Sequence, residues 1–403
     1  MQQFSPSETA LLSAVDAVPM LAQVQAWSAV NTGTGNLAGL AQQAALLADA
    51  FAALPGTVTL EAPAPVEAIA ADGSTIAVDY GQHLVLRVRP QAVRRFLLTG
   101  HMDTVFPADH SFRQTRWLDD ATLNGPGVAD MKGGIAVILA ALTAFETSEA
   151  AAAVGYDVMI NADEETGSLS SARLIADLAH GKVAALTYEP SALPDGTLAG
   201  ARAGSGNYSL VVRGKSAHAG RNPDDGRNAL VAAAALAVGL KAIHCDGLSV
   251  NPARIDGGSA NNVVPDLAVL RFNIRPRDAD AESKFARAIE VLIAKTTTDH
   301  DVTIHMHGGI SRPPKPIDAR AEKLFGLVAQ CSALLGQPLS RIASGGVCDG
   351  NNIAACGVPV VDTMGVRGGA IHSSDEFLIV SSLEERAKLS ALVLHRLATG
   401  APL

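Results

Sequence analysis

The chain has 403 residues, of which 48% are hydrophobic and 18% are charged. This is the composition of a globular protein, and the length is enough for two domains with separate cores. The formal net charge is -9, and no run rich in lysine and arginine is present. Proteins that bind the phosphate backbone carry such a basic footprint, so we expect no nucleic acid partner.

The apolar residues and the cysteines bear on the compartment. The first thirty residues contain Glu8 and Asp16 and lack a basic segment followed by an apolar one, which disfavours a secretion signal. The apolar run 231–240 is shorter than the roughly 20 residues that cross a bilayer. The 4 cysteines form no CxxC pair, which fits a reducing compartment. We therefore expect a cytoplasmic protein without a membrane partner.

Runs typical of strands alternate with helical runs up to about residue 200. Strands are expected at 84–88, 96–98 and 158–160, helices at 135–145 and 174–178, and a loop at 147–155. This alternation predicts an α/β sheet with helices on its faces. Ligand sites in such sheets collect where strands end, and the segments rich in acids and histidine follow the predicted strands.

The pattern changes near Ala203. Strands are expected at 208–212, 249–255, 268–274 and 302–307, and helices at 228–243 and 281–295. The resulting order βαββαβ is that of the ferredoxin-like unit. After the proline-rich segment 312–316, helix and strand signals typical of the first 200 residues return. We therefore predict a discontinuous α/β domain, residues 1–203 and 313–403, interrupted by an inserted βαββαβ domain, residues 204–312.

The first candidate metal ligand is His101, which directly follows a strand of the buried type. A strand end holds the imidazole still. Asp103 lies two residues on and can accept the second ring N–H, as carboxylates do beside zinc-bound histidines. A surface loop with a capping aspartate is the alternative interpretation of this segment.

Asp130 stands among glycines in the segment 125–134, just before a long apolar run. An aspartate at this place commonly caps the following helix. The surplus of glycine indicates an unusually tight turn, which would let the carboxylate point at something other than its own helix. The segment alone leaves both interpretations open.

Three adjacent acids, Asp163, Glu164 and Glu165, follow another predicted strand. Solvated charge runs are common and usually carry no function. Like charges packed at a strand end, however, repel one another unless a cation or a raised pKa relieves them. The run therefore favours a metal ligand beside a carboxylate that accepts protons.

Two more residues complete the set of candidate ligands. Glu189 ends a further strand, and His372 precedes more acids near the C-terminus. Either residue alone is more often structural or solvated than catalytic. Two zinc ions need about three protein ligands each, and five residues with one bridging carboxylate meet that number. The joint supply of ligands from five segments predicts a centre with two metal ions.

These segments resemble the di-zinc family of aminoacylases, acetylornithine and succinyl-diaminopimelate deacylases, and glutamate carboxypeptidases. Four motifs occur in the family's order and spacing, namely GHMD at 100–103, GVADMKGG at 127–134, DEETGS at 163–168 and HSSDE at 372–376. The resemblance covers nearly the whole chain. It implies a di-zinc exopeptidase-type catalytic domain, an inserted lid and dimerisation domain, and therefore a homodimer.

By this resemblance, His101 and Glu189 hold one metal ion, Glu165 and His372 hold the other, and Asp130 bridges the two. The ions are expected to be zinc, with cobalt or manganese as alternatives, because the same donors accept several divalent ions. The family's peptide bond after the bridging aspartate is often cis, which here is the bond that joins residues 130 and 131.

The resemblance also implies the proton chemistry. Asp103 orients His101. Glu164 is the general base that takes a proton from the attacking water and later gives it to the leaving amine. A carboxylate suits both tasks when its pKa is raised towards the working pH.

Residues of the inserted domain and its border are assigned in the same way. His218 matches a histidine that reaches the active site of a partner subunit and stabilises the oxyanion. Asn262 and Arg275 match positions that bind the substrate's carboxylate or the oxyanion, and arginine suits a bidentate grip. Arg312 is a further substrate-binding candidate, with a crossing between the domains as an equal alternative. Cys348 stands where the family more often has serine or threonine, and we expect it to line the pocket passively, with a reactive thiol as the alternative.

Glutamate rather than aspartate at position 189 resembles the members that release a single amino acid. We therefore expect a glutamate-carboxypeptidase-like enzyme that hydrolyses the amide bond of an N-acyl amino acid or of a short peptide with a free C-terminal carboxylate. An N-acetyl amino acid deacylase of the acetylornithine type is the alternative among enzymes. A catalytically silent binding homologue is the alternative outside them.

Overall fold

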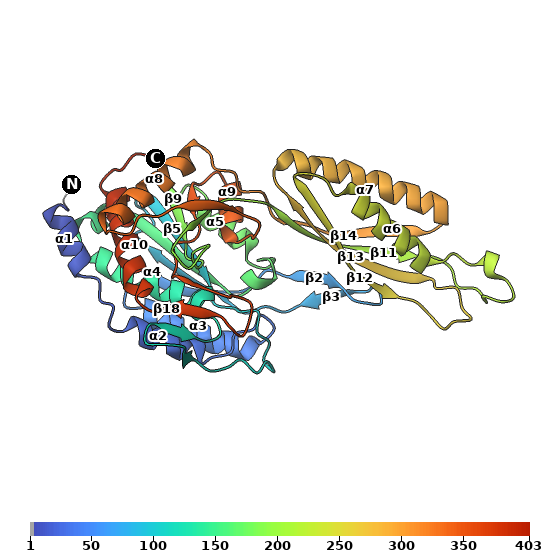
Figure 1. Ribbon diagram of the computed structural model, residues 1–403, viewed down its shortest axis with the longest axis horizontal. Coiled ribbons are helices and arrows are strands. Elements are labelled where there is room, and N and C mark those ends of the chain that lie inside the picture. Colours follow the sequence, from blue (N-terminus) through green and yellow to red (C-terminus); the bar gives the residue numbers. More distant parts are fainter. Residues whose placement is uncertain (1–3) are drawn as a thin grey trace.

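The computed structural model describes residues 4–403 and has two lobes arranged along its long axis (Figure 1). The larger lobe contains both ends of the described part of the chain, and the smaller lobe is one continuous insertion (Figure 1). The smaller lobe, hereafter the lid, contains a sheet that begins at Ser205 and ends at Arg312. From the sequence we expected an inserted domain at residues 204–312.

The larger lobe is built around a six-stranded mixed sheet in the order β1-β4-β8-β5-β9-β16. Its strands are β1 (Thr57–Glu61), β4 (His83–Val88), β5 (Arg95–His101), β8 (Gly155–Asn161), β9 (Ala184–Thr187) and β16 (Val360–Val361). The strands β8, β5, β9 and β16 run parallel, whereas β4 is antiparallel to both of its neighbours. The parallel strands β8 and β9 are buried along their whole length, as is usual for a sheet covered on both faces.

Alternate residues of each strand pack against different helices. Leu98 and Val158 belong to the core that contains α4 (Gly133–Glu146), whereas Leu97 and Met159 pack with residues of α5 (Ala172–Ala179) and α9 (Asp349–Ala355). The helices of this lobe are α1 (Pro6–Ser13), α2 (Met20–Ser28), α3 (Leu37–Phe51), α4 (Gly133–Glu146), α5 (Ala172–Ala179), α8 (Ala319–Leu334), α9 (Asp349–Ala355) and α10 (Ser382–Ala398). The sheet is therefore the middle layer of three.

The central helix α4 is the most apolar segment of the lobe. The stretch Val128–Glu146 is long and apolar enough, by length and composition, to cross a membrane. From the sequence we expected no such stretch, because only the shorter apolar run 231–240 was considered. In the fold, 89% of its apolar window is buried inside the protein. Helix α4 packs against α10 and α2, so its apolar surface is explained by the core that it forms.

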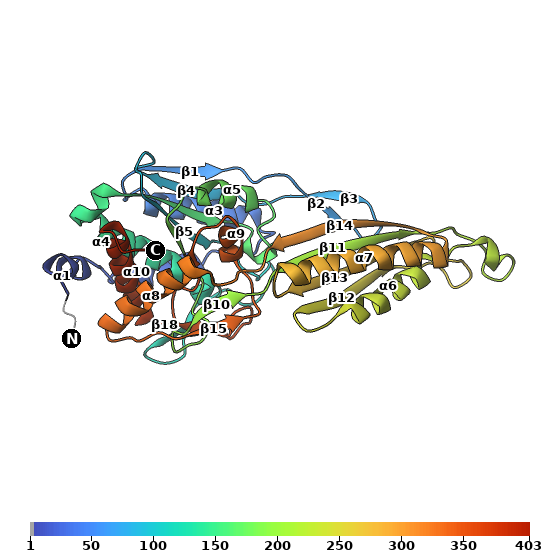
Figure 2. The same ribbon diagram turned by 90° about the horizontal axis from the view of Figure 1, so that it is seen from above.

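The lid follows the order βαββαβ. Its elements are β11 (Ser205–Arg213), α6 (Ala229–Ile243), β12 (Leu248–Gly257), β13 (Leu267–Pro276), α7 (Ala279–His300) and β14 (Thr303–Arg312). The four strands pair antiparallel in the order β12-β13-β11-β14, and both helices cover one face of the sheet (Figure 2). The lid has a hydrophobic core of its own between these helices and the sheet.

A hairpin of the larger lobe reaches the face of the lid sheet that carries no helix. Its strands are β2 (Val66–Ile69) and β3 (Thr75–Val78) (Figure 1). The side chain of Arg271 donates a hydrogen bond to the carbonyl oxygen of Ile69 at 2.8 Å. The hairpin thus connects the two lobes independently of the chain crossings.

Short elements complete the larger lobe. They are β6 (Arg116–Trp117), β7 (Thr122–Asn124), β10 (Leu198–Arg202), β15 (Arg341–Ser344), β17 (Gly368–Gly369), β18 (Phe377–Ile379), the turns Glu149–Ala153 and Glu164–Thr166, and the irregular turn Val128–Lys132, whereas the short turn Pro223–Asp225 belongs to the lid. The expected loop 147–155 therefore contains a short helical turn and the start of β8. The strands β6, β7, β18 and β17 form a separate small sheet.

Candidate metal centre

The five candidate ligands come from five separate segments of the larger lobe. His101 is the last residue of β5, Glu165 lies in the turn after β8, and Glu189 follows β9. Asp130 lies just before α4, and His372 lies in the loop before β18. Parallel strands end at one edge of a sheet, so the fold itself brings the first three together.

The carboxylate of Asp130 lies between the two histidines. Its Oδ1 is 3.1 Å from Nε2 of His101, and its Oδ2 is 3.3 Å from Nε2 of His372. Nε2 of His372 is also 3.2 Å from Oε2 of Glu165, and Nε2 of His101 is 3.7 Å from Oε2 of Glu189. The structure therefore brings the five side chains together as two groups that share one carboxylate.

The donors of this cluster fit two divalent cations. Ligand atoms of His101, Asp130 and Glu165 all lie within 4.8 Å of one another. Oε1 of Glu189 is buried and has no hydrogen-bond partner among the described residues. Burial and the nearby Asp130 raise the pKa of Glu165 to about 7. Buried carboxylates this close together are costly without a positive charge, and mixed nitrogen and oxygen donors suit zinc, cobalt or manganese.

Asp103 joins one histidine to the acidic turn. Nδ1 of His101 lies 3.3 Å from Oδ1 of Asp103, and the backbone N–H groups of Glu164 and Glu165 donate to the two Asp103 oxygens at 3.1 Å each. The hydroxyl of Thr34 also donates to Asp103, at 2.8 Å. Burial opposes a charge on His101, but the carboxylates of Glu189 and Asp103 outweigh it and raise the pKa of His101. The backbone carbonyl oxygen of Asp103 lies closer to Nδ1 of His101, at 3.0 Å, so Asp103 contacts the ring through both its backbone and its side chain.

The loop that carries Asp130 is held by a residue to which the sequence assigned no role. The buried carboxylate of Glu376 accepts hydrogen bonds from the backbone N–H groups of Gly127 at 3.1 Å, Ala129 at 2.9 Å and Asp130 at 3.0 Å. Successive N–H groups around one anion form a stable nest. The peptide bond after Asp130 is cis. Glu376 is the last residue of the HSSDE motif, and its position there was the only signal for it.

Glu164 lies beside the cluster with one oxygen held. Its Oε1 accepts a hydrogen bond from Nη2 of Arg312 at 2.7 Å. The Glu164 carboxylate also forms a close group with His101 and Glu189. Burial raises the pKa of Glu164 well above its ordinary value, although the guanidinium of Arg312 opposes this. A carboxylate with a raised pKa next to a metal site can both accept and return a proton.

Arg312 is the last residue of β14, and its side chain is buried in the larger lobe. It donates to Glu164, to Oδ1 of Asp349 at 2.7 Å and to the hydroxyl of Ser168 at 3.0 Å. Arg312 thus lies at the crossing between the lobes, and the hydrogen bonds of its side chain go to protein groups. Asp349 was not singled out from the sequence, because it is far from its partners along the chain.

The three candidates on the lid do not lie together. His218 and Asn262 belong to segments at the end of the lid remote from the larger lobe (Figures 1 and 2). The backbone N–H of Ala219 donates to the carbonyl oxygen of Asn262 at 2.9 Å, so these two segments are neighbours. Arg275 lies at the opposite end of β13, where its Nη1 donates to the carbonyl oxygen of Gly345 at 3.4 Å. Within one chain, His218 and Asn262 are therefore separated from the metal cluster.

Cys348 lies in the loop before α9 and is buried. Its Sγ is 3.6 Å from Oδ2 of Asp362. Burial raises the pKa of the Cys348 thiol well above its ordinary value, so the reactive thiolate is disfavoured. A passive role is consistent with this environment.

Comparisons with known proteins agree with this arrangement. The model of peptidase family M20/M25/M40 matches residues 97–396. Carboxypeptidase G2 of Pseudomonas sp. (strain RS-16) is 28% identical over 378 residues, which cover 92% of this chain and 87% of the relative. Succinyl-diaminopimelate desuccinylase of Xanthomonas oryzae pv. oryzae (strain PXO99A) is 28% identical over 320 residues, which cover 75% of this chain and 83% of the relative.

Solved structures share the fold. Aminopeptidase PepT from Bacillus cereus ATCC 10987 superposes with a TM-score of 0.72 at 20% identity and covers 96% of this chain and 100% of its own. The M20 family metallo-carboxypeptidase Sso-CP2 from Sulfolobus solfataricus gives a TM-score of 0.71 at 14% identity, covering 94% of this chain and 99% of its own. At these identities the likeness concerns the fold.

Proposed function

The chain belongs to peptidase family M20/M25/M40, and on that premise we propose that it is a glutamate-carboxypeptidase-like amidohydrolase. The proposed substrate is an N-acyl amino acid or a short peptide with a free C-terminal carboxylate. The enzyme class follows from the family, whose members are metal-dependent amide hydrolases. The finer assignment is supported by the 28% identity to carboxypeptidase G2, which extends over 92% of the chain.

One observation carries the proposal, namely that Asp130 presents one carboxylate oxygen to each of two histidines. We assign His101 and Glu189 to one metal ion, Glu165 and His372 to the other, and Asp130 to both. When bound, such ions polarise a scissile carbonyl and lower the pKa of water. Zinc is the proposed metal, and cobalt or manganese are the alternatives.

Glu164 is the residue to which we assign the proton transfers. It takes a proton from the attacking water, whose oxygen bonds to the amide carbon. When the C–N bond breaks, Glu164 returns the proton to the leaving nitrogen. The hydrogen bond from Arg312 to Oε1 fixes the carboxylate and leaves Oε2 for the proton.

Substrate binding in this proposal requires two subunits. His218 and Asn262 lie at the remote end of the lid, so we assign them to the active site of a partner chain. Arg275 lies at the near end, and we assign it to the substrate's carboxylate. The active form is then a homodimer. The cytoplasmic location expected from the sequence stays a prediction.

The test is hydrolysis by protein with known metal content. The purified chain is stripped with a chelator, reloaded with two equivalents of zinc, cobalt or manganese, and assayed for amine release from a panel of N-acyl amino acids and dipeptides. Turnover of benzoyl-glutamate over acetylornithine supports the carboxypeptidase-like assignment, and the reverse preference supports the deacylase. Two bound metal ions without amine release from any substrate would make the chain a silent homologue.

A further inference from the structure

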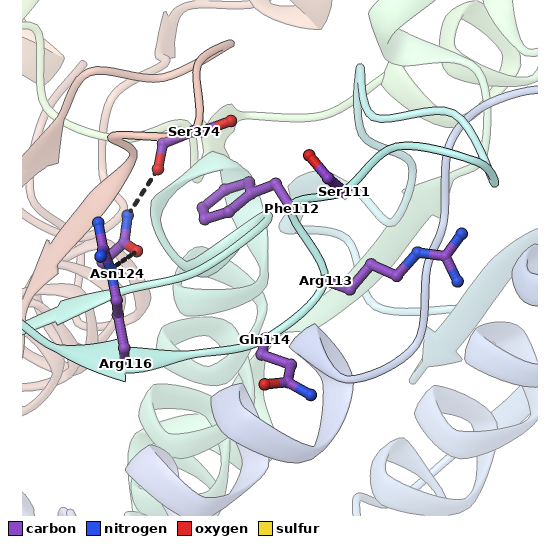
Figure 3. A pocket seen from close by; sticks show the side chains of 7 residues that line it. All are labelled: Ser111, Phe112, Arg113, Gln114, Arg116, Asn124 and Ser374. Carbon is purple, nitrogen blue, oxygen red and sulfur yellow. Dashed lines mark hydrogen bonds between the residues drawn. The ribbon is translucent and has the colours of Figure 1, made fainter.

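A cavity of about 400 Å³ is lined in part by the loop that carries His372, and none of the residues assigned a role above lines it. It is lined by Ser111, Phe112, Arg113, Gln114, Arg116, Asn124 and Ser374 (Figure 3). One wall is the loop that follows Asp103, and the opposite wall contains Ser374, two residues after His372. Because consecutive Cα atoms are 3.8 Å apart, the Cα of Ser374 lies within about 8 Å of that of His372. One wall of the cavity therefore lies close to His372, one of the proposed metal ligands.

Arg116 is the cation that this cavity offers. Its Nε donates to Oδ1 of Asn124 at 2.9 Å, and Figure 3 shows the two side chains next to each other. The amide nitrogen of Asn124 in turn donates to the carbonyl oxygens of Ser374 at 3.0 Å and Glu376 at 2.7 Å. Arg116 is thus fixed to the same turn that carries His372.

The outer nitrogens of Arg116 remain available. Among residues 4–403, neither Nη of Arg116 has a hydrogen-bond partner, and no carboxylate forms an ion pair with it. Arg113 differs, because its side chain donates to the backbone carbonyl oxygens of Ala108 and His110 in its own loop. Figure 3 shows Arg113 directed away from Asn124. One guanidinium of the two is therefore free to bind a ligand.

The aromatic wall of the cavity is held in place. The ring of Phe112 packs edge-on against the buried ring of Phe106, with 5.1 Å between centroids. Phe112 points towards Asn124 and Ser374 (Figure 3). An apolar surface opposite a guanidinium suits a short carbon chain that ends in a carboxylate.

We propose that this cavity is a subsite for a carboxylate of the substrate other than the one assigned to Arg275, and that Arg116 binds it. The inference rests on the proposed hydrolase function and deepens it, since the preferred substrates are then dicarboxylic. The second carboxylate belongs either to the acyl group or to the side chain of the released amino acid. Both sources offer Arg116 the same bidentate partner.

The experiment uses two matched pairs of substrates with the metal-loaded enzyme. N-succinyl-alanine and N-butanoyl-alanine differ in a charge on the acyl group, and N-acetyl-glutamate and N-acetyl-norvaline differ in a charge on the side chain. The measured quantity is the ratio of kcat/KM within each pair. Arg116→Ala is expected to lower the ratio of one pair by about 10- to 100-fold, mainly through KM, because it removes a charge-assisted hydrogen bond. Arg116→Lys should recover part of the ratio. The affected pair identifies the source of the carboxylate.

Arg287→Ala is the matched control, because Arg287 is an exposed arginine of α7 on the lid, and this variant should leave both ratios as in the wild type. Circular dichroism checks that the Arg116 variants are folded. Equal ratios in wild type and Arg116→Ala for both pairs overturn the subsite.

An enzyme that hydrolyses neither these substrates nor the panel of N-acyl amino acids and dipeptides refutes the proposed function but still allows the subsite to be tested. Binding of glutarate and butyrate is then measured by calorimetry on the wild type and Arg116→Ala. A preference for glutarate that Arg116→Ala abolishes supports the subsite. Its absence in the wild type rejects the subsite.

Discussion

Substitution can distinguish the carboxylate that accepts the proton from the carboxylate that binds metal. Glu164→Ala is expected to keep both metal ions and to lower kcat by at least about 100-fold, because it removes the proton acceptor but none of the assigned ligands. Asp130→Ala is expected to lose activity together with at least one metal ion, since it removes oxygens that face both histidines. Elemental analysis of the dialysed variants and steady-state rates give the two readouts. Release of metal from Glu164→Ala would show that the division between base and ligand is wrong.

Glu376 is expected to support metal binding without contacting the metal. Glu376→Gln keeps the shape of the side chain but loses one of the oxygens that accept the N–H groups around Asp130. The loop should then hold Asp130 less firmly, and zinc affinity should fall by about 10-fold or more, as for other residues that orient a ligand. Competition with a chromophoric chelator measures the affinity. An unchanged affinity in Glu376→Gln would mean that the loop keeps its shape without this carboxylate.

Some residues of the site could be predicted from the sequence, and others are recognised only from their contacts in the fold. His101, Asp130 and Glu165 stand in short motifs at predicted strand or helix ends, so local pattern made them candidates and the resemblance to a known family supplied their roles. Thr34 and Asp349 act through partners that are remote along the chain, Asp103 and Arg312, at separations of 69 and 37 residues. No local spacing encodes such a contact, and only the fold reveals it.

At the level of elements, the packing of α4 against Tyr188, which joins β9 to Glu189, allows a direct test. A Cβ atom at Gly134 would lie 2.1 Å from the carbonyl oxygen of Tyr188, a backbone atom that cannot move aside alone. Gly134→Ala is therefore expected to destabilise the fold by about 1 to 3 kcal/mol and to lower activity by displacing Glu189. Urea unfolding of the metal-free protein and amide hydrolysis of the loaded protein are measured.

Gly326→Ala is the control for this substitution. Gly326 lies within α8, and nothing would lie within 4 Å of its Cβ. Alanine favours a helix over glycine, so this variant should be as stable as the wild type or more stable. A Gly134→Ala protein as stable as the wild type would contradict the tight approach of α4 to this strand.

Elements with a strong local signal were predictable, and those defined by remote packing were not. The strands β4, β5 and β8 and the helix α4 are buried over nearly all of their length, so their continuous apolar runs are visible in the sequence. The hairpin of β2 and β3 is partly exposed and gains its contacts from the lid. Its position depends on a domain inserted more than a hundred residues later, which local periodicity does not describe.

At the scale of the whole molecule, the order of elements predicted an inserted lid but could not predict where its loops lie. In the structure, the pairing of β11 with β13 places the segment of His218 at the far end of the lid. The same pairing places Arg275 at the near end, beside the loop of Cys348. His218 and Arg275 are thus separated because of how the two strands pair. Since the proposed mechanism needs His218 at an active site, it requires a dimer.

Subunit complementation tests this requirement. His218→Ala and Glu164→Ala are each expected to be nearly inactive as homodimers. In a mixed dimer, one site combines the intact Glu164 of the first variant with the intact His218 of the second. Random exchange of equal amounts makes half of the dimers mixed with one working site each, so about a quarter of the wild-type activity should return. Mixing Asp130→Ala with Glu164→Ala is the control, because both changes disable the site of their own subunit and no dimer regains a complete one. If mixed dimers are detected by mass spectrometry and activity stays absent, His218 does not act across the interface.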